Sequence, residues 1–207
     1  MKRVTFLLIV VVLTTHATTF AQSVAGRVYV TYGTTRFTSH QSFDAITGTS
    51  SRDGLGVGGV VTGLWRGAFV DVAYTQQKLD GHRAFVDQGT VYSLGIPTRI
   101  TIRPLDIAGG WRFAGRRVTP YAGGGVTMAS YREDADFSIA GDNVDERKTG
   151  ALLLGGADVR VARLLTVGGE LRYRSITGVL GSGGVSQAFS EDQLGGLSFA
   201  ARVSVGR

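Results

Sequence analysis

The chain has 207 residues and no cysteine, which excludes disulfide bonds, thiol chemistry and cysteine-based zinc sites. Its formal net charge is +6, but the basic residues do not cluster along the sequence, so the charge does not indicate a nucleic-acid partner. Its 31 glycines lie within strand-like segments rather than in a low-complexity linker, which is typical of strands that bend and approach one another closely.

The beginning of the chain has the three parts of a secretory signal peptide. A basic tripeptide is followed by an almost unbroken apolar run over residues 4–13 and by a small-residue site that ends at Ala21. The apolar run is much shorter than the roughly 20 residues that a membrane-spanning helix needs. We therefore predict a signal peptide over residues 1–21, cleaved after Ala21, and one exported domain over residues 22–207.

The rest of the chain is a series of segments whose residues alternate in polarity with a period of two, as in β-strands. In the clearest of them, Val167, Leu171 and Tyr173 share one parity, whereas Glu170 and Arg172 share the other. Each such ribbon has one apolar and one polar face. The predicted strands are residues 24–37, 54–65, 68–78, 99–113, 120–132, 149–162, 164–176 and 193–206.

The connections between these strands are alternately very short and long. The long ones comprise residues 38–53, 79–98, 133–148 and 177–192. The second is polar at first and then more strand-like, so residues 91–96 are expected to extend the following strand beyond the membrane. This alternation is typical of bacterial outer-membrane barrels, whose short turns and both termini face the periplasm. The sequence therefore predicts an all-β fold: an eight-stranded antiparallel up-and-down transmembrane β-barrel after a cleaved signal peptide, located in the outer membrane.

A soluble barrel or β-sandwich has the same period of two, with the apolar face inside instead of outside. Aromatic residues near strand ends, the alternating loop lengths and the signal peptide without cysteines favour the membrane barrel. Tyr121 and Tyr131 share a parity at a spacing that spans ~25 Å along the membrane normal at a tilt of ~40°. The residues predicted to form the aromatic girdle are Trp65, Tyr74, Trp111, Tyr121, Tyr131 and Tyr173.

In a membrane barrel the polar parity faces the lumen, which in a barrel of eight strands is narrow enough for side chains to fill. Acids and arginines in that space are expected to pair, because an unpaired buried charge is very unfavourable. We predict a network that plugs the lumen; the alternative is a narrow pore whose selectivity these charges set. The predicted lumen residues are Arg27, Asp71, Asp106, Arg112, Asp158, Arg160, Glu170, Arg172 and Arg202.

Candidates for catalysis and for metal binding are few. His40 and Ser42 stand close together in a predicted loop, and a lipid-modifying enzyme of the outer membrane is the third functional class that we consider. Such enzymes hold these residues on strands, so we predict no enzymatic activity. The acidic residues of the segment 133–148 do not match a calcium-loop spacing, and we predict neither metal nor cofactor.

Two motifs, residues 120–126 (PYAGGGV) and 166–174 (TVGGELRYR), together with the signal peptide, resemble the small OmpA/OmpX-type outer membrane proteins with a beta-barrel domain. The resemblance implies an integral protein that the barrel assembly machinery inserts among outer-membrane lipid and lipopolysaccharide. It also implies that the long loops contact an extracellular partner. Members act as structural tethers, adhesins or narrow pores. Family members usually end with an aromatic residue that the assembly machinery reads. This chain differs, because its last aromatic residue is Phe199.

Overall fold

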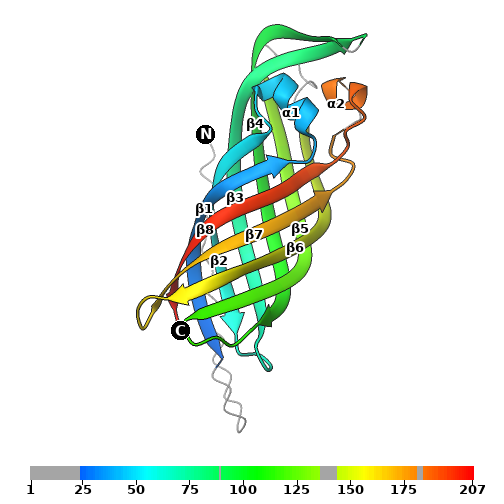
Figure 1. Ribbon diagram of the computed structural model, residues 1–207. Coiled ribbons are helices and arrows are strands. Elements are labelled where there is room, and N and C mark those ends of the chain that lie inside the picture. The colour runs from blue at the N-terminus through cyan, green and yellow to red at the C-terminus, as the bar shows by residue number, and fades with distance from the viewer. Residues whose placement is uncertain (1–23, 89, 136–143, 181–183) are drawn as a thin grey trace, which may run out of the picture.

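The computed structural model describes residues 24–88, 90–135, 144–180 and 184–207. Over these residues the chain forms eight strands and two short helices, and each strand pairs antiparallel with its sequence neighbours (Figure 1). The first and last strands also pair, so the backbone groups of the ring find partners without water. In chain order the elements are β1 (Ala25–Phe37), α1 (His40–Thr47), β2 (Ser51–Thr62), β3 (Ala68–Asp87), β4 (Thr90–Arg112), β5 (Val118–Ala135), β6 (Val144–Arg160), β7 (Leu165–Ile176), α2 (Gly184–Ala188) and β8 (Leu194–Gly206).

The strands place their apolar parity outside and their charged parity inside. Val28 on the outer face is 67% exposed, whereas Arg202 in the lumen is 1% exposed. A soluble barrel has the opposite arrangement, because water would face its charged side. The predicted eight-stranded membrane barrel is therefore confirmed. Neither helix of the described residues is long and apolar enough to cross a membrane.

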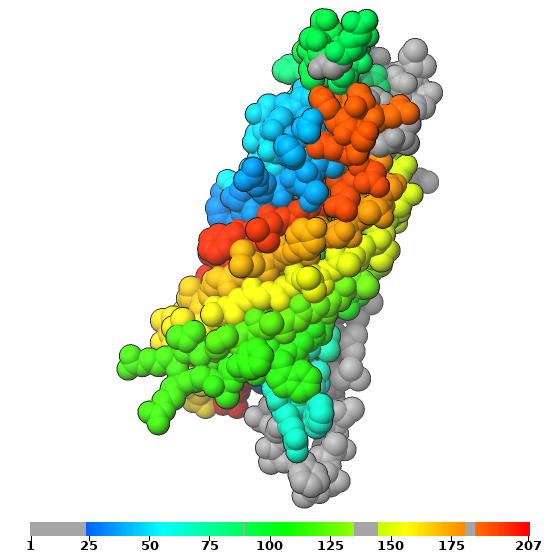
Figure 2. Space-filling view, turned by 45° about the vertical axis from the view of Figure 1, so that its right-hand side comes forward, coloured from blue at the N-terminus to red at the C-terminus, as the bar shows by residue number. Residues whose placement is uncertain are grey.

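The two ends of the barrel differ in their connections. At one end, short turns over residues 63–67, 113–117 and 161–164 join the strands, and β8 ends there. The other end carries α1 and α2. The end of β3 and the beginning of β4 extend beyond both helices there (Figures 1 and 2). Short turns face the periplasm in outer-membrane barrels, so the end with the helices is extracellular.

The prediction of a loop is wrong for residues 79–90, whereas the expected extension of the next strand over residues 91–96 is confirmed. β3 continues to Asp87 and β4 begins at Thr90, and these two residues pair, so the segment is a β-hairpin. Its register shifts between His82 and Ala84, which interrupts the alternation on which the prediction relied. The predicted loops 38–53 and 177–192 contain α1 and α2. The predicted signal peptide lies outside the described residues.

Candidate functional site

Arg172 on β7 is the centre of an ion-pair network inside the barrel. Its guanidinium donates hydrogen bonds to Glu170 at 2.5 Å, Asp106 at 2.9 Å and Asp71 at 2.9 Å, and to the hydroxyl of Tyr29 at 3.1 Å. The three carboxylates come from β7, β4 and β3, so one side chain joins distant parts of the ring. All five side chains are buried.

Arg202 on β8 forms the second centre of this network. It donates a hydrogen bond to Glu170 at 3.0 Å, and its nitrogen lies 3.7 Å from Asp71. Its guanidinium also lies 3.6 Å from the ring centroid of Tyr29, close enough for a cation–π interaction. Tyr29 donates to Asp71 at 2.8 Å, and Tyr121 donates to Glu170 at 3.0 Å. Each carboxylate therefore has both a cationic and a hydroxyl partner.

Further ion pairs lie above and below these two arginines. Towards the extracellular end, Arg174 binds Asp106 at 2.7 Å. Towards the periplasmic end, Arg112 donates a hydrogen bond to Asp158, and Arg27 lies 3.6 Å from the same carboxylate. The charged layers thus follow one another along most of the lumen. Burial makes such pairs expensive to break, because the partner that remains would be an uncompensated charge.

Two glycines provide the space that the tyrosine rings of the network occupy. A Cβ atom at Gly58 would lie 2.4 Å from the ring of Tyr29, and one at Gly156 would lie 2.6 Å from the hydroxyl of Tyr121. Real Cβ atoms do not approach other atoms so closely. The glycines inside the strands therefore have a steric role: they let a narrow barrel hold large aromatic side chains beside its charges.

The structure corrects three of the predicted site residues. Tyr121 and Tyr131 are each 3% exposed and face inward, so their assignment to the aromatic girdle is wrong. Arg160 has the inward parity of Asp158 but is exposed at the periplasmic mouth of the lumen, so it is not a buried member of the network. The other predicted lumen residues face inward, and the other predicted girdle residues face outward. The inward-facing residues are Arg27, Asp71, Asp106, Arg112, Asp158, Glu170, Arg172 and Arg202, and the outward-facing ones are Trp65, Tyr74, Trp111 and Tyr173.

The prediction also missed network members, namely Tyr29, Tyr121 and Arg174. Tyr29 shares the parity of Arg27, and Arg174 that of Arg172, so the alternation already placed both inside. These residues make the network larger than the charged residues alone would suggest.

An apolar lid covers the extracellular end of the lumen. Phe43 of α1 is buried there and stacks on Phe37 of β1, with ring centroids 4.2 Å apart. Ile46 and Leu180 pack against the same cluster from α1 and from the segment before α2. The buried members of this lid are Phe37, Phe43, Leu79, Ile100, Ile102, Ala129, Tyr131, Ile176, Val179 and Leu194.

Glu191, which follows α2, holds the start of α1 in place. One carboxylate oxygen accepts a hydrogen bond from the backbone N–H of Gln41 at 3.2 Å, and the other accepts from the backbone N–H of Ser42 at 2.8 Å. The hydroxyl of Ser42 donates to Glu191 at 2.6 Å, and the imidazole of His40 lies 3.9 Å from it. The carboxylate therefore satisfies amides that the first turn of a helix leaves without partners.

Replacing Glu191 by alanine is expected to loosen α1 without unfolding the barrel. Loss of a helix cap typically costs ~1 kcal/mol, so the amides of α1 should exchange with deuterium about fivefold faster. Hydrogen exchange measured by mass spectrometry checks this. The control is Asp192→Ala, a change at the exposed neighbouring residue. Unchanged exchange in the Glu191 variant would show that the cap does not hold the lid.

Little space remains between the network and the lid. A cavity of about 30 Å³ lies between Arg172, Arg174 and Gln77, and one of about 10 Å³ lies beside Phe37 and Ile176. The larger of these is about the volume of one water molecule.

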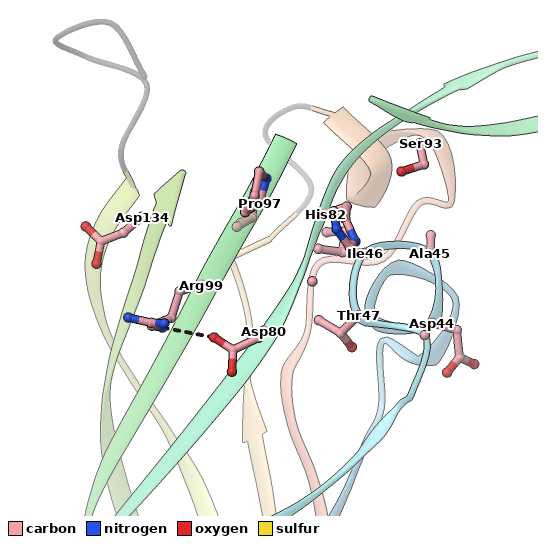
Figure 3. Close-up of a pocket in the computed structure, with 13 residues that line it drawn as sticks. Asp44, Ala45, Ile46, Thr47, Asp80, His82, Ser93, Pro97, Arg99 and Asp134 are labelled. Carbon is pink, nitrogen blue, oxygen red and sulfur yellow. Dashed lines mark hydrogen bonds and ion pairs between the residues drawn. The ribbon is translucent and has the colours of Figure 1, made fainter. Parts of the chain in front are cut away.

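A larger pocket, of about 720 Å³, lies at the extracellular end between the last turn of α1 and the hairpin (Figure 3). Asp80 and Arg99 face each other on its strand side and form an ion pair at 2.9 Å. Asp44 and Asp134 also line it, so its walls carry more acidic than basic side chains. Within the described residues, no group of three or more histidine, cysteine or acidic side chains is placed to hold a metal ion.

A closed barrel with an apolar outer face and a charged lumen defines the class of integral outer-membrane β-barrel proteins. The chain belongs to the family described as outer membrane protein beta-barrel domain, whose model matches residues 6–204. The family and the fold together place the protein in the outer membrane. No curated protein sequence matches the chain.

Solved structures of other outer-membrane proteins have a similar fold. One is Ail, the attachment invasion locus protein of Yersinia pestis, in complex with the heparin analogue sucrose octasulfate. It is 12% identical and has a TM-score of 0.51, and the alignment covers 87% of this chain and 98% of that chain. Another is Neisserial surface protein A, at 14% identity and a TM-score of 0.49, with coverage of 88% and 96%.

Proposed function

We propose that the protein is a closed outer-membrane barrel with a structural and surface-interaction role, and that it neither conducts solutes nor catalyses a reaction. The observation that carries this proposal is the filled lumen, in which ion pairs around Arg172 and Arg202 lie beneath an apolar lid. A narrow pore is the alternative, and it would require the network or the lid to rearrange. The closed barrel and the narrow pore would have the same fold in the membrane.

The extracellular end supports the interaction role. Phe85 and Tyr92 stack in the hairpin with ring centroids 5.1 Å apart, and both are exposed, as are Val91 and Leu94. Apolar side chains gathered outside the membrane indicate a surface that a partner covers. Ail, which shares the fold, is named for attachment and was crystallised with a heparin analogue. We propose an extracellular partner for the hairpin, with lipopolysaccharide as the lipid neighbour and the barrel assembly machinery as the partner during biogenesis.

The residues considered for catalysis support a structural role. The hydroxyl of Ser42 donates to Glu191, and Glu191 also accepts the amides of α1, so this group fixes the lid. A nucleophilic serine would instead be hydrogen-bonded to its base, His40. We also propose that residues 1–21 are removed on export.

Purified barrel reconstituted into a planar lipid bilayer is expected to give no steady single-channel openings, because the lumen is filled. Folding must be verified on the same sample by gel mobility with and without boiling, since a closed backbone ladder resists unheated detergent. Steady openings from a sample that shows the mobility shift would overturn the closed-barrel proposal in favour of a pore.

A further inference from the structure

Four basic side chains surround Thr101 on the outer face of the barrel. Thr101 of β4 pairs with Lys78 of β3 and with Arg132 of β5. Arg99 and Arg103 lie two residues before and after it on the same face. Thr101 faces outward and yet is only 6% exposed, so long neighbouring side chains lie over it. We call Lys78, Arg99, Arg103 and Arg132, with Arg147 of β6, the basic patch.

Acidic neighbours neutralise only part of the basic patch. Arg99 pairs with Asp80 at 2.9 Å, and Arg132 pairs with Asp134 at 2.9 Å. Among the described residues, Lys78, Arg103 and Arg147 form no ion pair. Arg103 and Arg147 flank the same residue of β5, Ser130, in the pairing register. Asp145 of β6 faces outward beside Arg132 and Arg147, so Lys78 and Arg103 are the two cations of neighbouring strands that lie farthest from an acidic side chain of β6.

The apolar band of the barrel begins directly below these cations. Leu105 follows Arg103 on the same face and pairs with Tyr74 on β3 and Met128 on β5, and the latter two are exposed. The patch therefore lies where lipid hydrocarbon meets the headgroups. A soluble anion would find only the charges, whereas a membrane lipid would contact both the charges and the apolar band.

A groove beside Lys78 adds a second contact for such a lipid. It has a volume of about 400 Å³ and crosses β1, β2 and β3 on the outer surface. Leu55, Val57 and Tyr74 line its apolar part. Its polar rim holds Lys78 and Arg52 and also Asp53, whose carboxylate accepts hydrogen bonds from the hydroxyls of Tyr32 and Thr34. Cations at one end and apolar walls at the other match a phosphate group joined to an acyl chain.

We propose that Lys78 and Arg103 bind a phosphate group of an outer-leaflet lipid, with an acyl chain in the groove lined by Leu55, Val57 and Tyr74. The proposal rests on the outer-membrane location and names where on this chain the lipid partner binds. The guanidinium group of arginine and the ammonium group of lysine both bind phosphate. Their pairing with a phosphate group is stronger at an interface with lipid, where less water screens the charges. Arg147, on the far side of Ser130, extends the positive surface for a second phosphate.

The test measures binding of bisphosphorylated lipid A to the full-length barrel in phosphatidylcholine nanodiscs by native mass spectrometry. Lys78→Gln/Arg103→Gln is expected to weaken binding about tenfold or more, because two charge-assisted contacts are lost. The matched control is Arg116→Gln/Arg117→Gln, which removes two exposed charges from the periplasmic turn between β4 and β5. It should bind as the unchanged protein does. Lipid A without phosphates should bind weakly, and equally to all three proteins.

Three results would overturn the proposal. The first is equal binding of phosphorylated lipid A by the patch variant and the unchanged protein. The second is an equal loss for phosphorylated and dephosphorylated lipid, which would make the groove alone responsible. The third is a loss of binding to soluble heparin with lipid binding intact, which would assign the patch to an extracellular polyanion. Heat-dependent gel mobility verifies that each variant folds, and failure of the closed-barrel proposal would appear in the conductance experiment.

Discussion

Replacing Arg172 by methionine is expected to lower the free energy of unfolding of the barrel by about 3–5 kcal/mol. The guanidinium bonds to Glu170, Asp71 and Asp106, so its removal leaves buried carboxylates with less positive charge than they need. A urea titration of the barrel in lipid vesicles measures the effect. Tryptophan fluorescence can follow it, because Trp65 and Trp111 pack together at the periplasmic end.

Two comparisons decide whether the network causes that loss. Arg116→Met removes an exposed arginine from a turn and should change the free energy of unfolding by less than ~0.5 kcal/mol. The double variant Glu170→Gln/Arg172→Met should be less destabilised than the sum of its single variants, because it removes a carboxylate together with its main cation. Strict additivity, or an Arg172 variant as stable as the Arg116 control, would contradict a coupled network.

Replacing Gly156 by alanine is expected to lower the free energy of unfolding by about 1–3 kcal/mol, as overpacking of a dense interior does. The new methyl group would meet the backbone oxygen of Gly169 at 2.4 Å and the hydroxyl of Tyr121 at 2.6 Å. Tyr121 would then have to move away from Glu170, to which it donates a hydrogen bond. The same urea titration measures the change.

The neighbouring Gly169 provides the matched control. Its position on β7 pairs with Ala157, and a Cβ atom there would find its nearest neighbour, the ring of Phe199, at 4.0 Å. Gly169→Ala should therefore be neutral or slightly stabilising, because alanine restricts the unfolded chain. Equal destabilisation of both variants would mean that strand glycines matter for backbone flexibility rather than for the space they leave to Tyr121.

Alternation of polarity predicts most of this fold. In a strand that separates lipid from a charged lumen, successive side chains point alternately to the lipid and to the lumen. It also contained a signal for Tyr121 that the prediction overlooked. Val126 and Met128 have the opposite parity and are apolar, which places Tyr121 inside. The spacing of Tyr121 and Tyr131 fitted a membrane thickness by coincidence. The parity of a residue is the stronger criterion for the face on which its side chain lies, because strand geometry fixes that face.

Local sequence says less about the extracellular end. The hairpin over residues 79–98 changes register at His82 and carries charged residues, so its alternation is weak. The cap of α1 comes from Glu191, about 150 positions away in the sequence, and only the closed ring brings the two together. The basic patch likewise combines residues of β3, β4, β5 and β6. No local motif records any of these contacts.

The attachment of Glu191 to α1 divides the extracellular end into two parts with different freedom to change during evolution. An insertion near α1 or near Glu191 would disturb both segments and the lid that they hold. The hairpin extends beyond both helices (Figure 1), and its tip lies between Asp87 and Thr90. Exposed loop tips tolerate insertions and substitutions because few packed contacts depend on them. Foreign epitopes grafted for display should therefore leave the barrel folded when they are inserted at the hairpin tip, and should disturb the lid when they are inserted at the helices.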